Sequence, residues 1–201
     1  HGFVKMIRLG VLGSTNGTDL QAILDAIESR RLISEVSVVI SNKKNAFILE
    51  RAKKYKVPYH YISHKHIDRE TFDGRITSIL NIYNVDLVLL IGFMRILSGS
   101  FCREWKGKIL NVHPSLLPKY AGGMDTNVHE EVLRNKDKET GCTIHFVTDE
   151  VDQGPIFIQK TCSVDPGESV NSLKKKVQDL EGEAFLEAIP LFETKYVLKN
   201  E

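Results

Sequence analysis

An asparagine and a histidine that stand two residues apart are the residues of this chain best suited to chemistry. Asn111 and His113 follow an apolar run at 108–110 and lie just before Pro114. In an extended strand such residues point to the same face, and Pro114 would end the strand because it has no N–H to donate. Open α/β sheets bind ligands at such strand ends. An amide can stabilise a developing oxyanion and an imidazole can transfer a proton, so the pair suits attack on an acyl carbon.

An isolated Asn-x-His pattern is weak evidence, because a polar strand end before a proline-rich turn often produces it by chance. Two further segments strengthen it: GFMRILS at residues 92–98 and HFVTDEVDQGP at 145–155. Together with NVHPSLLPKY at 111–120, they resemble the folate-dependent formyltransferases, over about residues 7–190. The small-residue loop at 13–19 narrows the resemblance to the branch that formylates 5′-phosphoribosylglycinamide in purine synthesis. The resemblance implies 10-formyltetrahydrofolate as the formyl donor, and no metal.

Strands and helices are expected to alternate along the chain. Apolar and amphipathic patterns predict strands at 7–12, 36–41, 59–62, 85–91, 108–112, 143–147 and 155–162, and helices at 20–29, 46–56, 69–83, 100–105, 128–135 and 169–191. This order predicts an α/β fold: a Rossmann-like, doubly wound, mostly parallel sheet followed by a mixed C-terminal β/α portion. We expect one formyltransferase domain over residues 1–201, with 1–5 an added segment ahead of a Met6 start.

Composition argues against a nucleic-acid or membrane partner and favours the cytoplasm, and the resemblance implies small-molecule substrates. The chain has 27 Lys and Arg against 26 Asp and Glu, a net charge of +1, which makes no case for a nucleic-acid partner. The longest apolar run, at 85–93, is too short to span a bilayer. The three cysteines have no framework spacing, so we expect free thiols in a reducing compartment. Monomer and homodimer both remain open.

The exit of the first predicted strand has the composition of a phosphate-binding loop. GSTNGTD at 13–19 leads into a helix, whose N-terminus offers free N–H groups and a positive dipole end. An ordinary turn with Asp19 as the helix cap explains the same residues equally well. The resemblance assigns the substrate phosphate to the backbone amides of Gly17, Thr18 and Asp19. Asp19 and Thr15 stand where many relatives carry Asn and Gly.

The segment after the fourth predicted strand carries the expected folate contacts. Taken alone, it is a strand end that runs into the apolar base of a short helix. The resemblance makes it one wall of a pterin pocket, whose backbone groups bond the edges of a flat ring. It also implies that Arg69, at a predicted helix start, contacts the folate. The implied folate-binding residues are Arg69, Met94, Arg95, Ile96, Leu97 and Asn111.

An acidic turn, DEVDQG at 149–154, supplies the third expected catalytic residue. Such turns are common between strands, but the resemblance selects Asp152. A carboxylate beside His113 would favour the imidazolium and raise the pKa of the histidine above about 6.5. Gln153 replaces a Gly that many relatives have, so the form of this turn is open.

The remaining polar residues are assigned with help from the resemblance. Gln178 and Glu181 share one face of the last predicted helix, a common arrangement on helix surfaces; the resemblance has them hold the glycinamide end of the substrate. Residues 121–127 differ from a shorter, histidine-bearing segment of many relatives, and we expect His129 to cap the helix or to face solvent. His145 fits either a buried core position or the site.

Three other classes of protein stay open. A methionyl-tRNA formyltransferase would need an additional domain and a basic RNA-binding surface. A formyltetrahydrofolate hydrolase would have a regulatory domain and another residue in place of Pro114. A folate or nucleotide binding module would not need Asn111, His113 and Asp152 together, so their joint presence favours an enzyme.

Overall fold

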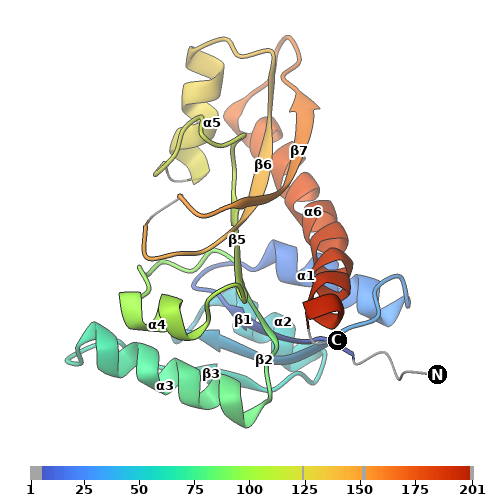
Figure 1. The fold of residues 1–201 in the computed structure, drawn as a ribbon. Coiled ribbons are helices and arrows are strands. Elements are labelled where there is room, and N and C mark those ends of the chain that lie inside the picture. The colour runs from blue at the N-terminus through green and yellow to red at the C-terminus, as the bar shows by residue number, and fades with distance from the viewer. Residues whose placement is uncertain (1–5, 124, 151–152, 200–201) are drawn as a thin grey trace. The chain divides into compact units, whose positions relative to one another are not determined.

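The computed structural model describes residues 6–123, 125–150 and 153–199, and the chain forms two compact units. The first unit extends to Leu110 and the second begins at Asn111. Both are visible in Figure 1, where β5 (Ile109–His113) carries the chain from one to the other.

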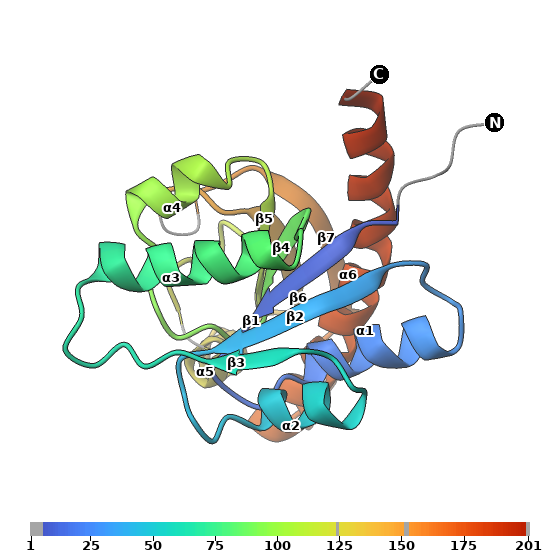
Figure 2. The same ribbon diagram turned by 90° about the horizontal axis from the view of Figure 1, so that it is seen from below.

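The first unit is a parallel α/β sheet with the strand order β3-β2-β1-β4. Its elements are β1 (Arg8–Leu12), α1 (Thr18–Glu28), β2 (Glu35–Ser41), α2 (Phe47–Lys54), β3 (Tyr59–Tyr61), α3 (Arg69–Ile82), β4 (Leu87–Leu90) and α4 (Gly99–Glu104). Figure 2 shows α1 and α2 on one side of this sheet and α3 on the other. Both faces are therefore covered, which explains why β1, β2 and β4 are buried along almost their whole length.

The second unit contains the end of β5, α5 (Asp125–Arg134), β6 (Glu139–Phe146), β7 (Ile156–Ser163) and α6 (Val170–Lys199). β6 and β7 form an antiparallel pair with a register irregularity between Ile144 and His145. α6 packs against both strands and against α5. Val128 and Val132 of α5 pack with Leu173 of α6 to form the buried centre of that helix contact.

The predicted α/β class and the mostly parallel sheet are confirmed, while several element ends differ. α1 begins at Thr18 with Gly17 as its N-cap, so the expectation that Asp19 caps the helix was wrong; Asp19 lies in the first turn and is buried. α6 continues past Pro190 to Lys199. Buried Ile189 and Phe192 flank that proline, and their packing offsets the backbone hydrogen bond that Pro190 removes.

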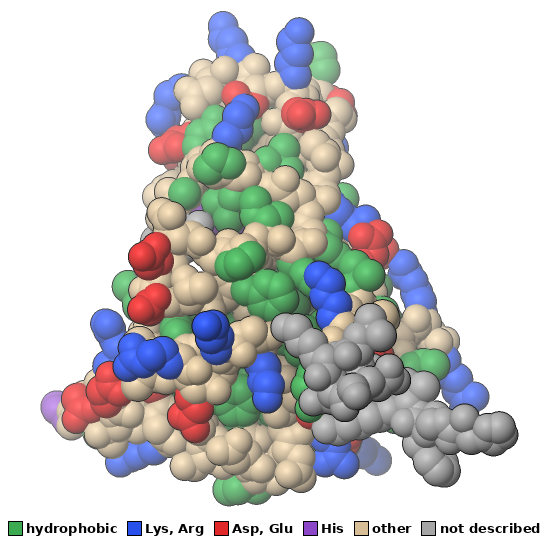
Figure 3. Space-filling model, in the orientation of Figure 1, with side chains coloured by type: hydrophobic (Ala, Val, Ile, Leu, Met, Phe, Trp, Pro, Cys, Tyr) green, Lys and Arg blue, Asp and Glu red, His purple; other side chains and the backbone are tan. Residues whose placement is uncertain are grey.

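The surface carries both signs of charge. On the face drawn in Figure 3, Lys and Arg side chains are interspersed with Asp and Glu, in keeping with a net charge of +1. Among the helices that the structure describes, none combines the length and the apolar character needed to cross a bilayer.

Gly17 is required by the packing beneath its loop. Its φ is 72°, a left-handed conformation that favours glycine. A Cβ added at Gly17 would lie 2.4 Å from Cγ1 of Ile48, a buried side chain of α2. A larger residue at position 17 would therefore disturb the fold whether or not a ligand binds there.

Gly17→Ala should lower the free energy of unfolding more than Gly107→Ala does. Both glycines have a positive φ, 72° and 74°, so alanine costs about 1–2 kcal/mol at each. Nothing lies within 4 Å of a Cβ added at Gly107, whereas the collision with Ile48 should add about 1–3 kcal/mol at Gly17. Denaturant unfolding of both variants measures the difference, and equal losses would show that Ile48 moves aside freely.

Tyr120 fixes the segment that follows β5. Its backbone is left-handed, with a φ of 57°, which is uncommon for a residue other than glycine. Its hydroxyl donates to Oδ2 of Asp137 at 2.7 Å and accepts from Nδ2 of Asn135 at 2.9 Å. Burial is the main cause that raises the pKa of Tyr120 above 10.0, and the Asp137 carboxylate adds to it.

Tyr120→Phe should lower the free energy of unfolding by about 1 kcal/mol at neutral pH, through loss of these hydrogen bonds. The pKa of Tyr120 is higher in the folded than in the unfolded protein. The stabilisation is therefore complete below pH about 10 and is lost as the pH rises through the folded-state pKa. The difference between wild type and variant should shrink above pH about 10; a constant difference would contradict the assignment.

Tyr55→Phe is the control for that comparison. The Tyr55 hydroxyl likewise donates to a carboxylate, Oδ1 of Asp25 at 2.7 Å, and accepts from an amide, Nε2 of Gln21 at 2.9 Å, and the bond to Asp25 is the main cause that raises its pKa above 10.0. The difference in stability between wild type and Tyr55→Phe should therefore also shrink above pH about 10.

Candidate active site

The end of β5 carries the pair that the sequence singles out. Asn111 and His113 both lie within the strand, which extends one residue further than predicted, so their side chains point to one face. Asn111 is half-buried and His113 is 4% exposed. Both side chains are held by hydrogen bonds to groups of the second unit, and these bonds decide which of their atoms can serve a substrate.

His145 orients the amide of Asn111. Its Nδ1 lies 3.1 Å from the backbone oxygen of Phe146, and its Nε2 lies 3.3 Å from Nδ2 of Asn111. A backbone oxygen only accepts, so Nδ1 carries the proton and Nε2 accepts from the asparagine amide. His145 is thus a neutral acceptor, buried to 2% exposure. This geometry leaves the second N–H of Asn111 Nδ2 available to a substrate oxygen.

The protonation of His113 is set in the same way. Its Nε2 lies 2.9 Å from the backbone oxygen of Tyr120. Because that oxygen cannot donate, Nε2 carries a proton. The left-handed backbone of Tyr120 and its bond to Asp137 hold the accepting oxygen in place.

Side chains of β6 and β7 secure the segment that follows His113. Thr143 accepts from the N–H of Leu117 at 3.0 Å and donates to the oxygen of Ser115 at 2.7 Å. Gln159 donates to the oxygen of Leu117 at 2.9 Å, and the Leu117–Pro118 peptide bond is cis. Thr143 and Gln159 stand far along the chain from the motif that they support.

Asp152, the third predicted catalytic residue, lies outside the described residues. The glycine that follows it in the motif is required by packing, because a Cβ added at Gly154 would lie 1.7 Å from the backbone oxygen of Phe146. The N–H of Phe146 also donates to the oxygen of Pro155 at 2.9 Å. The end of the DEVDQGP segment is thus fixed against the end of β6.

Gln178 and Glu181 both lie on α6, three residues apart as predicted; Gln178 is half-buried and Glu181 is buried to 8% exposure. Burial at this level is unusual for a helix-surface glutamate and fits a polar site better than a solvated face. His129 on α5 is fully buried, so the expectation that it faces solvent was wrong.

In the first unit, the loop after β1 leads into α1. Gly17 is the N-cap, and Thr18 and Asp19 form the first turn, where backbone N–H groups lack partners within the helix. Arg51 of α2 supports this loop: its Nε donates to the oxygen of Asn16 at 2.7 Å and its Nη2 to Oδ1 of Asn16 at 3.2 Å. The sequence patterns did not indicate Arg51, because its partner Asn16 lies 35 residues away along the chain.

The predicted pterin wall follows β4. Met94 and Ile96 are 49% and 60% exposed, while Leu97 is buried. The Arg95 guanidinium lies over the ring of Phe72, 4.4 Å from its centroid. Arg69 is the exposed first residue of α3. Exposed apolar side chains at 94 and 96 do not serve the core, which fits the binding of a flat ring better than the base of a helix.

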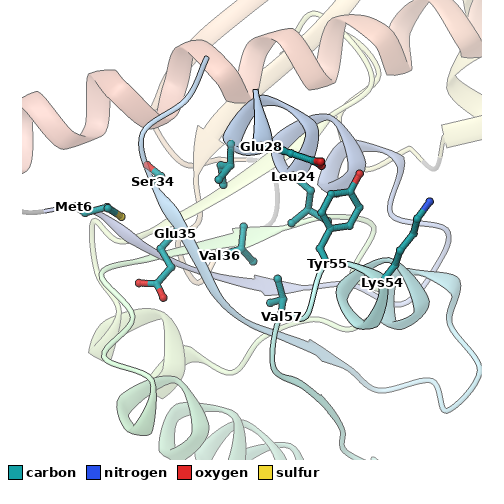
Figure 4. Close-up of a pocket in the computed structure, with 10 residues that line it drawn as sticks. Met6, Leu24, Glu28, Ser34, Glu35, Val36, Lys54, Tyr55 and Val57 are labelled. Carbon is teal, nitrogen blue, oxygen red and sulfur yellow. The ribbon is translucent and has the colours of Figure 1, made fainter. Parts of the chain in front are cut away.

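A cavity of about 700 Å³ lies at the opposite edge of the first unit's sheet. Figure 4 shows Met6 before β1, Glu35 at the start of β2 and Val57 before β3 around it. These are the amino ends of parallel strands, whereas the loops of Gly17 and Met94 follow the carboxyl ends. The cavity is therefore separate from the candidate site. No cluster of three or more His, Cys, Asp or Glu side chains suited to a metal occurs among the described residues.

Comparisons with known proteins place the chain in a family. The family described as "Formyl transferase" matches residues 7–189. Phosphoribosylglycinamide formyltransferase of Escherichia coli (strain K12) is 42% identical over 172 residues, which cover 85% of this chain and 80% of that protein. The trifunctional purine biosynthetic protein adenosine-3 of Chironomus tentans is 42% identical over 197 residues, 96% of this chain but 14% of its own length.

Comparison with solved structures supports the same family. Glycinamide ribonucleotide transformylase 1 from Symbiobacterium toebii has a TM-score of 0.88 at 40% identity, covering 94% of this chain and 89% of that one. The chain belongs to the formyl transferase family.

Proposed function

We propose that this chain transfers the formyl group of 10-formyltetrahydrofolate to the amine of 5′-phosphoribosylglycinamide, a step of de novo purine (IMP) biosynthesis. The observation that carries the proposal is the paired orientation of Asn111 and His113 on one strand face, each with one side-chain nitrogen fixed by a hydrogen bond. Two pre-oriented donors are what the oxyanion of acyl transfer requires. The activity of the similar phosphoribosylglycinamide formyltransferases, for which they are named, supports the choice of substrates.

The proposed reaction begins when the substrate amine attacks the formyl carbon. A new C–N bond forms, and the carbonyl oxygen becomes an oxyanion held by Nδ2 of Asn111 and by protonated His113. The bond from that carbon to the folate nitrogen then breaks, and the folate nitrogen takes up the proton that the amine gives up, through His113 or a water held by Asp152. The negative charge of Asp152 favours the imidazolium. The step uses no metal.

The phosphate of the ribonucleotide would bind the backbone amides of Gly17, Thr18 and Asp19 at the start of α1. The helix dipole favours an anion at that position. Arg51, fixed to Asn16 of the same loop, adds a positive charge that offsets the carboxylate of Asp19.

The other proposed contacts follow the family pattern. The backbone of 94–97 holds the pterin, Arg69 contacts the folate, Asn111 borders it, and Gln178 and Glu181 hold the glycinamide end. We further propose that the protein works in the cytoplasm on small molecules, as a monomer or a homodimer.

One assay tests the function. The purified chain is incubated with 10-formyltetrahydrofolate and one of three acceptors: 5′-phosphoribosylglycinamide, methionyl-tRNA or water alone. Formyl transfer to the ribonucleotide amine supports the proposal. Formyl transfer to the tRNA would support a methionyl-tRNA formyltransferase instead, and release of formate with water alone would support a formyltetrahydrofolate hydrolase.

Asn111→Ala and His113→Ala should each lower kcat by about 10²–10³, the usual cost of one oxyanion donor, with little change in either KM. The two losses should not multiply in the double variant, because the residues act on one oxyanion. Steady-state kinetics of the three variants measures this. Near-normal turnover in either single variant would remove that residue from the chemistry.

His145→Phe should lower kcat by about tenfold or more without raising either KM, because Asn111 loses the acceptor that aims its amide. His145→Gln should recover part of the loss, since the glutamine oxygen can accept from Asn111. A structural role alone would affect both variants through stability and would leave kcat per folded molecule unchanged. Kinetics corrected for the folded fraction separates the two cases.

A further inference from the structure

Ser14 connects the loops that follow three neighbouring strands of the first unit. β1 lies between β2 and β4, and Ser14, just beyond the end of β1, has a partner on each side. Its hydroxyl donates to Oδ1 of Asn42, just after β2, at 2.6 Å. The same hydroxyl accepts from the N–H of Met94 at 2.8 Å. Its own N–H donates to the oxygen of Gly92 at 3.0 Å. One residue thus bridges both neighbouring loops.

The Ser14–Asn42 part of this bridge is buried, and the bridge is directional. Ser14 is 6% exposed and Asn42 is 3% exposed. A hydroxyl has a single hydrogen, which here points to Asn42, so its lone pairs face the Met94 N–H. Burial strengthens such linked bonds and makes the loss of any partner costly. Met94 therefore cannot shift its amide without disturbing Ser14.

The same two loops also interlock sterically. Gly92 has a φ of 61°, and a Cβ added there would lie 2.6 Å from Oγ1 of Thr15. The oxygen of Thr15 in turn accepts from the N–H of Ile48 at 3.1 Å. The loop before Gly17 is thus held between α2 and the loop that leads into 94–97, and a displacement of one loop is transmitted to the other.

We propose that Ser14 is a positioning residue that couples the two substrate sites of the first unit. The inference rests on the proposed function, in which the loop ending at Gly17 holds the phosphate and 94–97 holds the pterin. Phosphate binding displaces the first loop toward the ligand, and through Ser14 this displacement moves the Met94 amide and the peptide planes that follow. Each substrate then raises the affinity for the other by the same factor, as linkage requires.

Methionine labelling gives a direct readout of this coupling. The chain has three methionines, at positions 6, 94 and 124, so [15N]methionine yields a spectrum with few amide signals. Addition of 5′-phosphoribosylglycinamide should shift the Met94 signal in the wild type. In Ser14→Ala that signal should no longer respond, although the ribonucleotide still binds. Met6, which precedes β1, is the internal reference.

Affinity measurements give the magnitude. The dissociation constant of 5′-phosphoribosylglycinamide is measured with and without saturating tetrahydrofolate, which has no formyl group to transfer. We expect the folate to tighten binding about fivefold or more in the wild type, and to have almost no effect in Ser14→Ala. Ser37→Ala is the matched control: it removes another buried hydroxyl, on β2, and should retain the wild-type ratio.

A pair of variants at Asn42 covers the case in which Ser14→Ala folds poorly. Asn42→Asp keeps an acceptor for the Ser14 hydroxyl and should retain the coupling, whereas Asn42→Leu, of similar size, removes that acceptor and should weaken it. Equal ratios in these two variants would contradict the bridge.

The remaining outcomes distinguish failure of the Ser14 coupling from failure of the proposed function. Formyl transfer without any coupling in the wild type, or a Met94 signal that shifts equally in Ser14→Ala, overturns the inference alone. A wild-type chain that does not bind the ribonucleotide overturns the proposed function and the inference together.

Discussion

Buried backbone groups beyond the ends of strands must find hydrogen-bond partners, and the candidate site is built where this need is met. Within β1, pairing with β2 on one side and with β4 on the other gives the backbone its hydrogen-bond partners. Past their ends the ladder stops, although Ser14 and Asn42 are still buried. Ser14 takes over, bonding Gly92, Met94 and Asn42. The loops proposed to hold substrates are therefore ordered by the same bonds that complete the core.

The second unit meets the same requirement with histidines and threonine. Past β5, Thr143 bonds the backbone of Ser115 and Leu117. The backbone oxygens of Tyr120 and Phe146 accept from His113 and His145. The two histidine bonds serve structure and chemistry together, because each also decides which imidazole nitrogen carries a proton. A site assembled this way is oriented before a substrate arrives, which lowers the reorganisation that the reaction needs.

Sequence patterns predicted the features that depend on neighbours along the chain. Continuous apolar runs located the parallel strands, and the Asn111–His113 spacing located one face of β5. The features that were missed depend on distant partners: Arg51 bonds Asn16 across 35 residues, and Asn111 bonds His145 across 34. The sequence predicted that Gly17 allows close approach of a phosphate, but the side chain of Ile48 on α2 already leaves no room for a Cβ at this position. The alternative that Asp19 caps α1 was wrong, because a left-handed Gly17 begins this helix without any side-chain cap.

The proposed phosphate site depends on where single charges lie and not on the overall charge of the chain. A net charge of +1 provides little general attraction for an anion. The Arg51 guanidinium uses Nε, Nη1 and Nη2 to bond Asn16 and Gln21, so its charge is fixed beside the start of α1. The carboxylate of Asp19, in the first turn of α1, interacts favourably with the helix dipole when no phosphate is bound. A bound phosphate competes with that carboxylate for the same positive potential, so Arg51 must outweigh Asp19 for the loop to prefer the dianion.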